Sequence, residues 1–146
     1  MKLLTIILLL SLILIASCSN TNKVIITNSQ QKDIEIQVSL AKTPQQKQQG
    51  LMNVSNLSQN QGMLFFFDNE DYYNFWMKDT LISLDIIFIN KDLRIVDIIQ
   101  AVPCKKDPCK VYTPKNKAQY VLEVNKDFAK DNKIVINNSL KLLINS

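Results

Sequence analysis

Polar and apolar residues alternate strictly between Asp33 and Leu40. A period of two residues is typical of a half-buried β-strand, because successive side chains point to opposite faces of the sheet. The pattern therefore predicts a strand over residues 33–40 that buries one face, made up of Ile34, Ile36, Val38 and Leu40.

A short helix is predicted directly after this strand. Thr43 is suited to cap the helix N-terminus, Pro44 suits the first helical position, and Gln46 can complete a capping box with Thr43. Gly50 can adopt the left-handed conformation that commonly ends a helix. These signals predict a short helix that begins at Pro44 and ends at Gly50.

The remaining apolar runs predict further strands, separated by polar turns. The clearest hairpin joins residues 84–89 to residues 93–99 through a turn at residues 90–92. Other elements are expected along the rest of the chain: strands at residues 62–67, 72–77, 119–124, 133–136 and 140–144, a turn at residues 68–71 and a short helix within residues 126–132. This pattern predicts a mainly β fold: a compact closed or nearly closed β-barrel of about seven short strands with one or two short helices, or a sandwich of similar content.

The N-terminal residues follow a different pattern, which is typical of an export signal. Lys2 is followed by an almost uninterrupted apolar run over residues 3–16, too short for a comfortable membrane span, which needs about 20 apolar residues. The run ends in Leu14-Ile15-Ala16-Ser17-Cys18, which resembles the lipobox of bacterial lipoproteins. We therefore predict three parts of the chain: a lipoprotein signal peptide at residues 1–17, a lipidated tether at residues 18–23 and a single β-rich domain at residues 24–146.

Cys18 is the predicted lipid attachment residue, because its thiol would take a diacylglyceryl group, and two or three acyl chains anchor a protein stably. This predicts an exported chain that is lipid-anchored to a bacterial membrane. If the bacterium has two membranes, Ser19 favours the periplasmic face of the outer membrane, since it is not the aspartate associated with inner-membrane retention. An uncleaved anchor helix and cleavage without lipid attachment are the two alternatives.

Composition narrows the possible classes of function. The 146-residue chain carries a formal net charge of +4 and its lysines are scattered, so nucleic-acid binding is not expected. It contains no histidine, which excludes Ser-His and Cys-His nucleophiles and histidine-ligated metals. Gly50 and Gly62 are its only glycines, so a glycine-rich phosphate loop is also excluded, and no cofactor is predicted.

The other two cysteines, Cys104 and Cys109, lie close together in the sequence. In an oxidising compartment such a pair is predicted to form a disulfide. A redox pair and a pair of thiolate metal ligands are the alternatives. The first usually has two intervening residues rather than four, and a closed zinc site needs four ligands. We therefore predict a structural disulfide and no metal site.

Five segments, in order along the chain, carry a family resemblance: Gly50-Leu51-Met52, Gly62-Met63-Leu64-Phe65, Phe75-Trp76-Met77-Lys78-Asp79-Thr80, Leu84-Asp85-Ile86-Ile87-Phe88 and Val121-Leu122-Glu123-Val124-Asn125. They resemble the prokaryotic family called domain of unknown function 192, from about Ile34 to the C-terminus. The segment with Cys104, Cys109 and Tyr112 is similar to a cysteine-containing branch of that family. The resemblance implies a compact β-barrel-like domain, often behind an export signal, with no established reaction, substrate or cofactor.

The chain departs from the family pattern at several positions. The family commonly has arginine where Lys47 stands and asparagine where Asp79 stands. It also has glycines near Asp127, Lys133 and Asn137. The loss of these glycines predicts altered turns in the last third of the chain.

Four residues form the candidate ligand-binding site: Trp76, Lys78, Asp85 and Glu123. Asp85 and Glu123 interrupt apolar strands, where a carboxylate must be paired or must lie at a strand end. The functional interpretation is a pocket in which Trp76 provides an aromatic platform and the other three provide convergent polar groups. In the structural interpretation, Lys78 pairs with Asp85, a carboxylate accepts backbone N–H bonds in a turn, and Trp76 belongs to the core.

The sequence thus predicts a membrane-anchored envelope lipoprotein with a small, non-catalytic β domain that binds an envelope glycan or an envelope protein. The alternative is a carboxylate-based hydrolase acting on an envelope glycan, with Asp85 and Glu123 as acid and base. This alternative requires the two carboxyl groups to lie about 5–10 Å apart in an open cleft.

Overall fold

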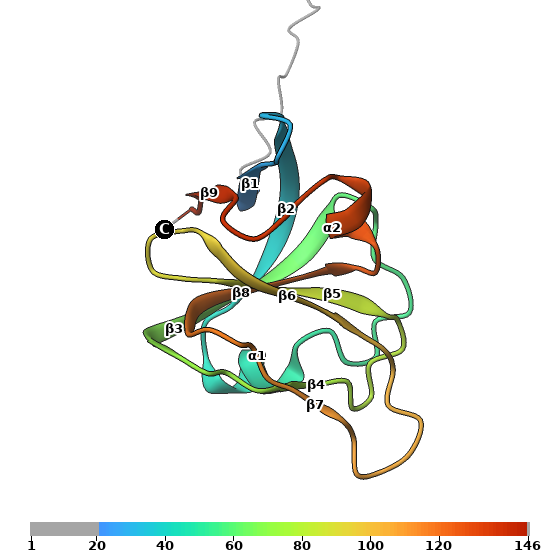
Figure 1. Cartoon of the computed structure of the whole chain (residues 1–146). Helices are drawn as coiled ribbons and strands as arrows, with labels where there is room; N and C mark the ends of the chain where they lie inside the picture. The colour runs from blue at the N-terminus through green and yellow to red at the C-terminus, as the bar shows by residue number, and fades with distance from the viewer. Residues whose placement is uncertain (1–20, 146) are drawn as a thin grey trace, which may run out of the picture.

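The structure, a computed structural model, describes residues 21–145 and is mainly β (Figure 1). The predicted signal peptide and the lipid attachment at Cys18 lie outside the described residues. The elements follow one another as β1 (Lys23–Thr27), β2 (Asp33–Ala41), α1 (Pro44–Gln49), β3 (Gln61–Asp71), β4 (Phe75–Trp76), β5 (Leu84–Ile89), β6 (Ile95–Ala101), β7 (Val111–Tyr112), β8 (Ala118–Asn125), α2 (Phe128–Asp131) and β9 (Ser139–Leu143). In this part of the chain no helix has the length and apolar character needed to cross a membrane.

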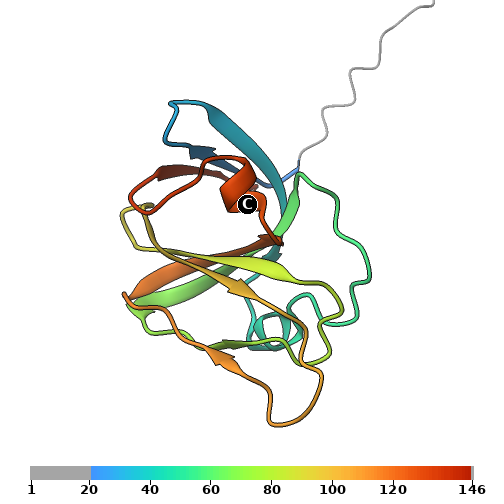
Figure 2. The ribbon, with the colours of Figure 1, turned by 45° about the vertical axis from the view of Figure 1, so that its right-hand side comes forward.

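Seven strands form one sheet in the order β6-β5-β8-β3-β2-β1-β9, and β4 and β7 form a separate pair. β2 and β3 run parallel, whereas the other neighbouring strands of the large sheet are antiparallel. The large sheet curls into a half-barrel that is open (Figure 2). The predicted mainly β fold is confirmed, but the sheet is more open than the closed or nearly closed barrel that we predicted. Its edge strands β6 and β9 are not ladder partners, and they approach each other where Arg94 forms an isolated bridge with Ser139.

The two faces of the sheet bury two separate hydrophobic clusters. On one face, which we call the α2 face, Ile87 of β5 and Leu122 of β8 pack with Phe128 of α2. On the opposite face, the α1 face, Ile86 of β5 and Phe65 of β3 pack with apolar residues that follow α1 and flank β4 and β7. β5 is therefore buried along its whole length, because both of its faces are covered.

The predicted local elements around α1 are confirmed. Ile36 and Val38 of β2 are buried, as the alternation predicts. The Thr43 hydroxyl accepts a hydrogen bond from the Gln46 backbone N–H at 3.2 Å, and the Gln46 side chain accepts one from the Thr43 N–H at 3.0 Å. Gly50 ends the helix with φ 47° and ψ −134°, which is the mirror image of extended backbone rather than the left-handed helical conformation we predicted.

Two predicted elements in the middle of the chain are different in the structure. β3 continues to Asp71, with an irregularity in its pairing with β8 after Phe66, so the turn predicted at residues 68–71 is wrong. The aromatic strand predicted at residues 72–77 is reduced to β4, which is two residues long. The residues that we expected to form a turn therefore continue the strand β3 instead.

Contacts that the local sequence pattern does not describe explain the other differences. β1 was not predicted, yet it pairs with β2 on one side and with β9 on the other. Residues 133–136 are not a strand, because Ile134 packs in the cluster of the α2 face and its N–H bonds to the Ala129 carbonyl at 2.8 Å. The predicted hairpin is confirmed as β5 and β6, in which Ile86 lies opposite Ile99.

The turns in the last third of the chain keep a positive φ without glycine. Asp127, Lys133 and Asn137 have φ values of 67°, 56° and 72°, and Asp79 has a φ of 53°. The resemblance implies glycines near the first three of these positions and an asparagine at the fourth, and both residues adopt such angles easily. The backbone at these positions therefore has the conformation that glycine favours, and the prediction of altered turns stays a prediction.

Candidate functional site

A small recess on the α1 face is lined by Glu123, which extends from β8. Glu123 lies opposite Met63 of β3 and Ile86 of β5 in the two ladders, so these three side chains share one face of the sheet. The recess is walled by residues of α1, β3 and β4 and by the residues beside them: Lys47, Gln48, Gln49, Gly50, Leu51, Met52, Phe65, Phe75, Trp76 and Thr80. Its volume of about 30 Å³ has room for about one or two water-sized groups.

The carboxyl group of Glu123 faces this recess without a partner. Glu123 is 5% exposed, and among the described residues its side chain takes part in no hydrogen bond or ion pair. Burial raises the pKa of Glu123 to about 8, because the charged form loses its hydration. No fully buried side-chain oxygen or nitrogen of the described residues lacks a hydrogen-bond partner, so the carboxyl oxygens of Glu123 reach the open space of the recess. A carboxyl group with a strongly raised pKa beside an open recess is typical of functional sites.

Gly50 leaves the space beside this carboxyl group open. A β-carbon at position 50 would lie 3.9 Å from Oε2 of Glu123 and 3.4 Å from Cζ of Phe65. The φ of 47° is also strained for any other residue. The residue that ends α1 therefore sets the width of the recess as well as the direction of the chain.

A larger groove adjoins the recess and shares four of its lining residues: Gln48, Gln49, Met52 and Trp76. The groove has a volume of about 470 Å³, and the rest of its lining is Gln45, Lys78 and Asp79. Trp76 is 47% exposed, and the Lys78 ammonium nitrogen lies 5.8 Å from the centroid of a Trp76 ring. Trp76 is therefore not a core residue, and its ring is accessible to a ligand in the groove.

Asp85 lies elsewhere, on the α2 face, where it holds the start of α2. Its Oδ2 accepts the Ala129 N–H at 3.0 Å, and its Oδ1 accepts the Asp127 N–H at 3.2 Å. The side-chain amide of Gln100 donates to Oδ1 at 3.4 Å. A helix N-terminus leaves backbone N–H groups without intrahelical partners, and Asp85 supplies the missing acceptors from another strand. Asp85 is a structural residue.

The geometry excludes Asp85 and Glu123 as a catalytic pair. Asp85 lies opposite Val124 in the β5–β8 ladder, whereas Ile86 lies opposite Glu123. Since side chains alternate between faces along a strand, the two carboxyl groups point to opposite sides of the sheet. The alternative of a glycan hydrolase that uses these two carboxylates is therefore wrong.

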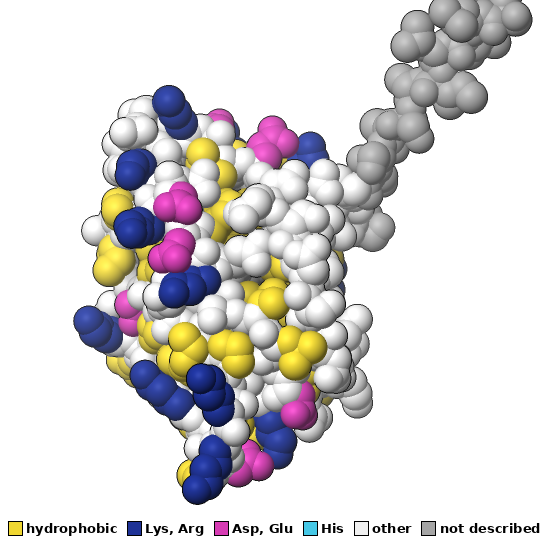
Figure 3. Space-filling model, turned by 90° about the vertical axis from the view of Figure 1, so that its right-hand side faces the viewer, with side chains coloured by type: hydrophobic (Ala, Val, Ile, Leu, Met, Phe, Trp, Pro, Cys, Tyr) yellow, Lys and Arg dark blue, Asp and Glu magenta, His cyan; other side chains and the backbone are white. Residues whose placement is uncertain are grey.

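Lys78 forms its ion pair with Asp107 rather than with Asp85, at an Nζ–Oδ2 distance of 3.7 Å. Both side chains are exposed, and such surface pairs contribute little to stability. Asp107 lies in the loop that is closed by the disulfide between Cys104 and Cys109. This disulfide confirms the predicted pairing of the two cysteines. Figure 3 shows basic side chains spread along one side of this face of the molecule, from its upper to its lower end, with acidic side chains among them.

One group of three potential metal ligands occurs in the described part of the chain, namely Cys104, Asp107 and Cys109. Both sulfur atoms belong to the disulfide, so neither is the thiolate that binds a metal. The prediction of a structural disulfide thus accounts for this cluster.

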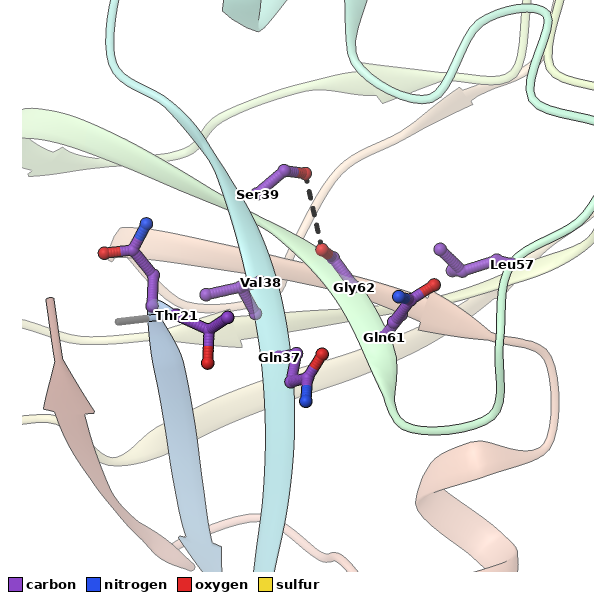
Figure 4. Close-up of a pocket in the computed structure, with 8 residues that line it drawn as sticks. Thr21, Gln37, Val38, Ser39, Leu57, Gln61 and Gly62 are labelled. Atoms are coloured by element: carbon purple, nitrogen blue, oxygen red, sulfur yellow. Dashed lines mark hydrogen bonds between the residues drawn. The ribbon is translucent and has the colours of Figure 1, made fainter. Parts of the chain in front are cut away.

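A separate hollow of about 480 Å³ lies between β2 and the start of β3 (Figure 4). The Ser39 hydroxyl donates to the Gly62 carbonyl there at 3.4 Å. The lining is made up of neutral residues: Thr21, Asn22, Gln37, Val38, Ser39, Leu57, Gln61 and Gly62. Because this hollow has no titratable side chain, it lacks the feature that marks the recess at Glu123.

The structure thus brings together three of the four predicted site residues. Trp76 lines both the recess and the groove, Glu123 lies in the recess and Lys78 lines the groove. We did not predict from the sequence that residues of α1 line both the recess and the groove. The segment Gly50-Leu51-Met52 was part of the family resemblance, yet its local signals indicated only the end of a helix.

The fold and the recess define a small, mainly β half-barrel domain with a buried, unpaired carboxyl group that faces a narrow recess. The chain belongs to the family DUF192, described as uncharacterized ACR, whose match covers residues 24–142. This confirms the resemblance seen in the five sequence segments.

Two crystal structures are similar to the chain, each at 29% sequence identity. One is of a protein from Sinorhizobium meliloti 1021 provisionally described as a transcription regulator; the TM-score is 0.78, and the match covers 84% of this chain and 93% of that one. The other is of a protein of unknown function from Novosphingobium aromaticivorans DSM 12444; the TM-score is 0.75, with 82% and 83% covered. No match was found among curated proteins.

Proposed function

We propose that this chain is an exported lipoprotein whose β domain binds a polar ligand of the cell envelope, without catalysis, in the groove and recess between α1 and Trp76. The observation that carries this proposal is the unpartnered carboxyl group of Glu123 in the recess. A bound ligand would supply the hydrogen bonds that this group lacks in the protein. An envelope glycan fragment or a segment of an envelope protein is the class of ligand that fits an exported domain.

The groove has the composition of a site for a polar ligand. The groove is lined by glutamine side chains of α1 and by the side chains of Lys78 and Asp79. These groups offer hydrogen-bond donors and acceptors beside the exposed ring of Trp76. Sites for small ligands commonly combine an apolar platform with a few polar groups that fix orientation. The recess then adds one buried polar group.

The position of the site suits a domain tethered by its N-terminus. β1 and β9 lie at one end of the molecule, whereas α1, β4 and β7 lie at the other (Figures 1 and 2). β1 begins at Lys23, close in sequence to the proposed lipid attachment at Cys18. An anchor there would leave the groove facing away from the membrane, where envelope ligands can reach it.

Replacing Trp76 by alanine is expected to weaken the binding of envelope glycan or peptide fragments about tenfold, since loss of an aromatic platform removes on the order of 1 kcal/mol. Because Trp76 is 47% exposed, its truncation leaves the core intact. Isothermal titration of the wild-type and variant proteins with fractionated envelope fragments measures the difference.

Tyr72→Ala is the matched control, because Tyr72 is also an exposed aromatic residue, at 51%, and does not line the groove. It is expected to bind as the wild-type protein does. Absence of any binding fragment or partner, or equal affinities of the wild-type and Trp76→Ala proteins, would contradict a ligand site at the groove.

Lipid attachment at Cys18 is a separate prediction. Cells that express the wild-type protein in the presence of a radioactive fatty acid are expected to label it, and Cys18→Ala is expected to remove the label, because the thiol is the only group at this position that can be acylated. The double variant Cys104→Ala/Cys109→Ala controls for the other cysteines and should be labelled normally. Equal labelling of the wild-type and Cys18→Ala proteins would refute the anchor.

A further inference from the structure

We propose that the recess binds a primary alkylammonium group and that the carboxylate of Glu123 is its counter-ion. This inference rests on the proposed function, because it names the chemical group of the ligand that enters the same site. Glu123 is 5% exposed, lines the recess and has no hydrogen-bond or ion-pair partner among the described residues. A carboxylate in such a place is stabilised most by a cation that brings hydrogen-bond donors with it.

The walls of the recess favour a cation. Phe65, Phe75 and Trp76 all line it, and the rings of Phe65 and Phe75 meet edge to face with centroids 5.1 Å apart. An ammonium group that enters the recess and meets the face of one of these rings is attracted by its partial negative charge. Thr80 also lines the recess, and because its hydroxyl donates to the Lys78 carbonyl at 3.3 Å, the lone pairs of its oxygen remain able to accept an N–H bond.

The size of the recess selects a primary amine. A volume of about 30 Å³ admits a terminal ammonium group on an unbranched chain but not a quaternary ammonium group with three methyl substituents. The larger adjoining groove, of about 470 Å³, would hold the rest of the ligand against Trp76. A lysine side chain within a peptide, or a diamine, has this shape.

Among the described residues, the two lysines beside the recess and the groove contact groups other than Glu123. Lys47 lines it, but its ammonium nitrogen lies 4.7 Å from the centroid of the Phe67 ring. Lys78 is directed to Asp107, at 3.7 Å. The other strands beside Glu123 present apolar residues, Met63 and Ile86, at the paired positions. No cation of the described residues pairs with Glu123, so the counter-ion of its ionised form is available for a ligand to supply.

Binding has a characteristic proton balance. Burial raises the pKa of Glu123 to about 8, so at pH 7 the free protein carries this carboxyl group about nine-tenths protonated. When the ligand ammonium group pairs with the carboxylate, the carboxyl proton leaves to the buffer and no covalent bond forms. The other titratable groups around the two hollows are Lys47, Lys78 and Asp79. Binding at pH 7 is thus expected to release nearly one proton per ligand.

The test is isothermal titration of the full chain in detergent micelles with n-butylammonium and with N-acetyl-lysine methylamide, in buffers of different ionisation enthalpy. We expect both probes to bind with release of nearly one proton at pH 7. Neutral n-butanol and tetramethylammonium are expected to bind at least tenfold more weakly. Glu123→Gln is expected to lower the affinity for both amines at least tenfold and to abolish proton release, whereas the exposed control Glu35→Gln should behave as wild type.

Gly50→Ala provides a second variant, because its β-carbon narrows the recess beside Glu123. It should bind the amines at least tenfold more weakly. Failure of both amines to bind, or unchanged binding and proton release in Glu123→Gln, would overturn the ammonium assignment. If envelope fragments without an amine still bind in a Trp76-dependent manner, the proposed ligand-binding function survives and only the ammonium group is wrong; if nothing binds, both proposals fail.

Discussion

Replacing Asp85 by alanine is expected to lower the free energy of unfolding by about 3 kcal/mol, since hydrogen bonds to charged groups are strong and the donors left behind are buried. Asp85 is 3% exposed and accepts the N–H groups of Asp127 and Ala129. Ala129 is itself 5% exposed, so its N–H would lose its acceptor where water cannot readily replace it. Urea unfolding followed by circular dichroism measures the change in midpoint.

Asp92→Ala is the control for this experiment, because Asp92 is an exposed carboxylate in the turn between β5 and β6. Its replacement should change stability by less than about 0.5 kcal/mol. Asp85→Asn keeps one acceptor oxygen, so its free energy of unfolding should lie between those of the Asp85→Ala and Asp92→Ala proteins. If Asp85→Ala were as stable as Asp92→Ala, Asp85 could not be the residue that holds α2.

Stability is expected to fall by several kcal/mol as the pH rises from about 4.5 to about 8, and Glu123→Gln is expected to remove this loss. The pKa of Glu123 is raised from its ordinary value of 4.5 to about 8 in the folded protein. Within that window the folded state binds more protons at Glu123 than the unfolded state does. Its contribution to stability is therefore fully present below the window and is lost as the pH rises through it. Each unit of pKa difference corresponds to about 1.4 kcal/mol.

The measurement is the unfolding free energy of both proteins at pH 5, 7 and 9 in urea. Glutamine resembles the protonated carboxyl group in shape and never ionises, so Glu123→Gln should be the more stable protein at pH 9. Glu35→Gln, which removes an exposed carboxylate paired with Lys23 at 3.1 Å, should keep the pH dependence of the wild-type protein. Parallel pH profiles for the wild-type and Glu123→Gln proteins would show that Glu123 is not the group responsible.

The local elements could be predicted because their signals act between residues that are close in the chain. The alternation over residues 33–40 predicted β2, and Thr43 with Gln46 predicted the start of α1. The hairpin of β5 and β6 followed from two apolar runs around a polar turn. In each case the hydrogen bonds or the buried face are formed within one short segment or between neighbouring ones.

The elements that could not be predicted depend on partners far away in the sequence. β1 is a strand because β2 and β9 both pair with it, and β9 lies at the other end of the chain. Residues 133–136 have a strand-like composition, but Ile134 packs against the cluster that contains α2. Whether the sheet closes is likewise a property of its edges β6 and β9, which no local pattern describes.

The candidate site, too, could be predicted from the sequence only in part. From the sequence alone, Asp85 and Glu123 are equivalent: each is a carboxylate within an apolar strand, which demands either a partner or a function. The register of β5 against β8 decides between them, because Ile86 rather than Asp85 lies opposite Glu123. That offset of one residue directs Asp85 to the N–H groups of α2 and leaves Glu123 facing the recess.

The sequence by itself determined the mainly β fold, the disulfide, the family and the identity of the two unusual carboxylates. These follow from local periodicity, from cysteine chemistry and from short motifs. Only the tertiary structure decided that the sheet stays open, that α1 with Gly50 walls the recess, and that Glu123, among the buried polar residues of the described part, has no hydrogen-bond partner. Burial and hydrogen bonding depend on which residues are in contact in the folded protein. In this chain the contacts that determine the site are made between strands that are distant in sequence.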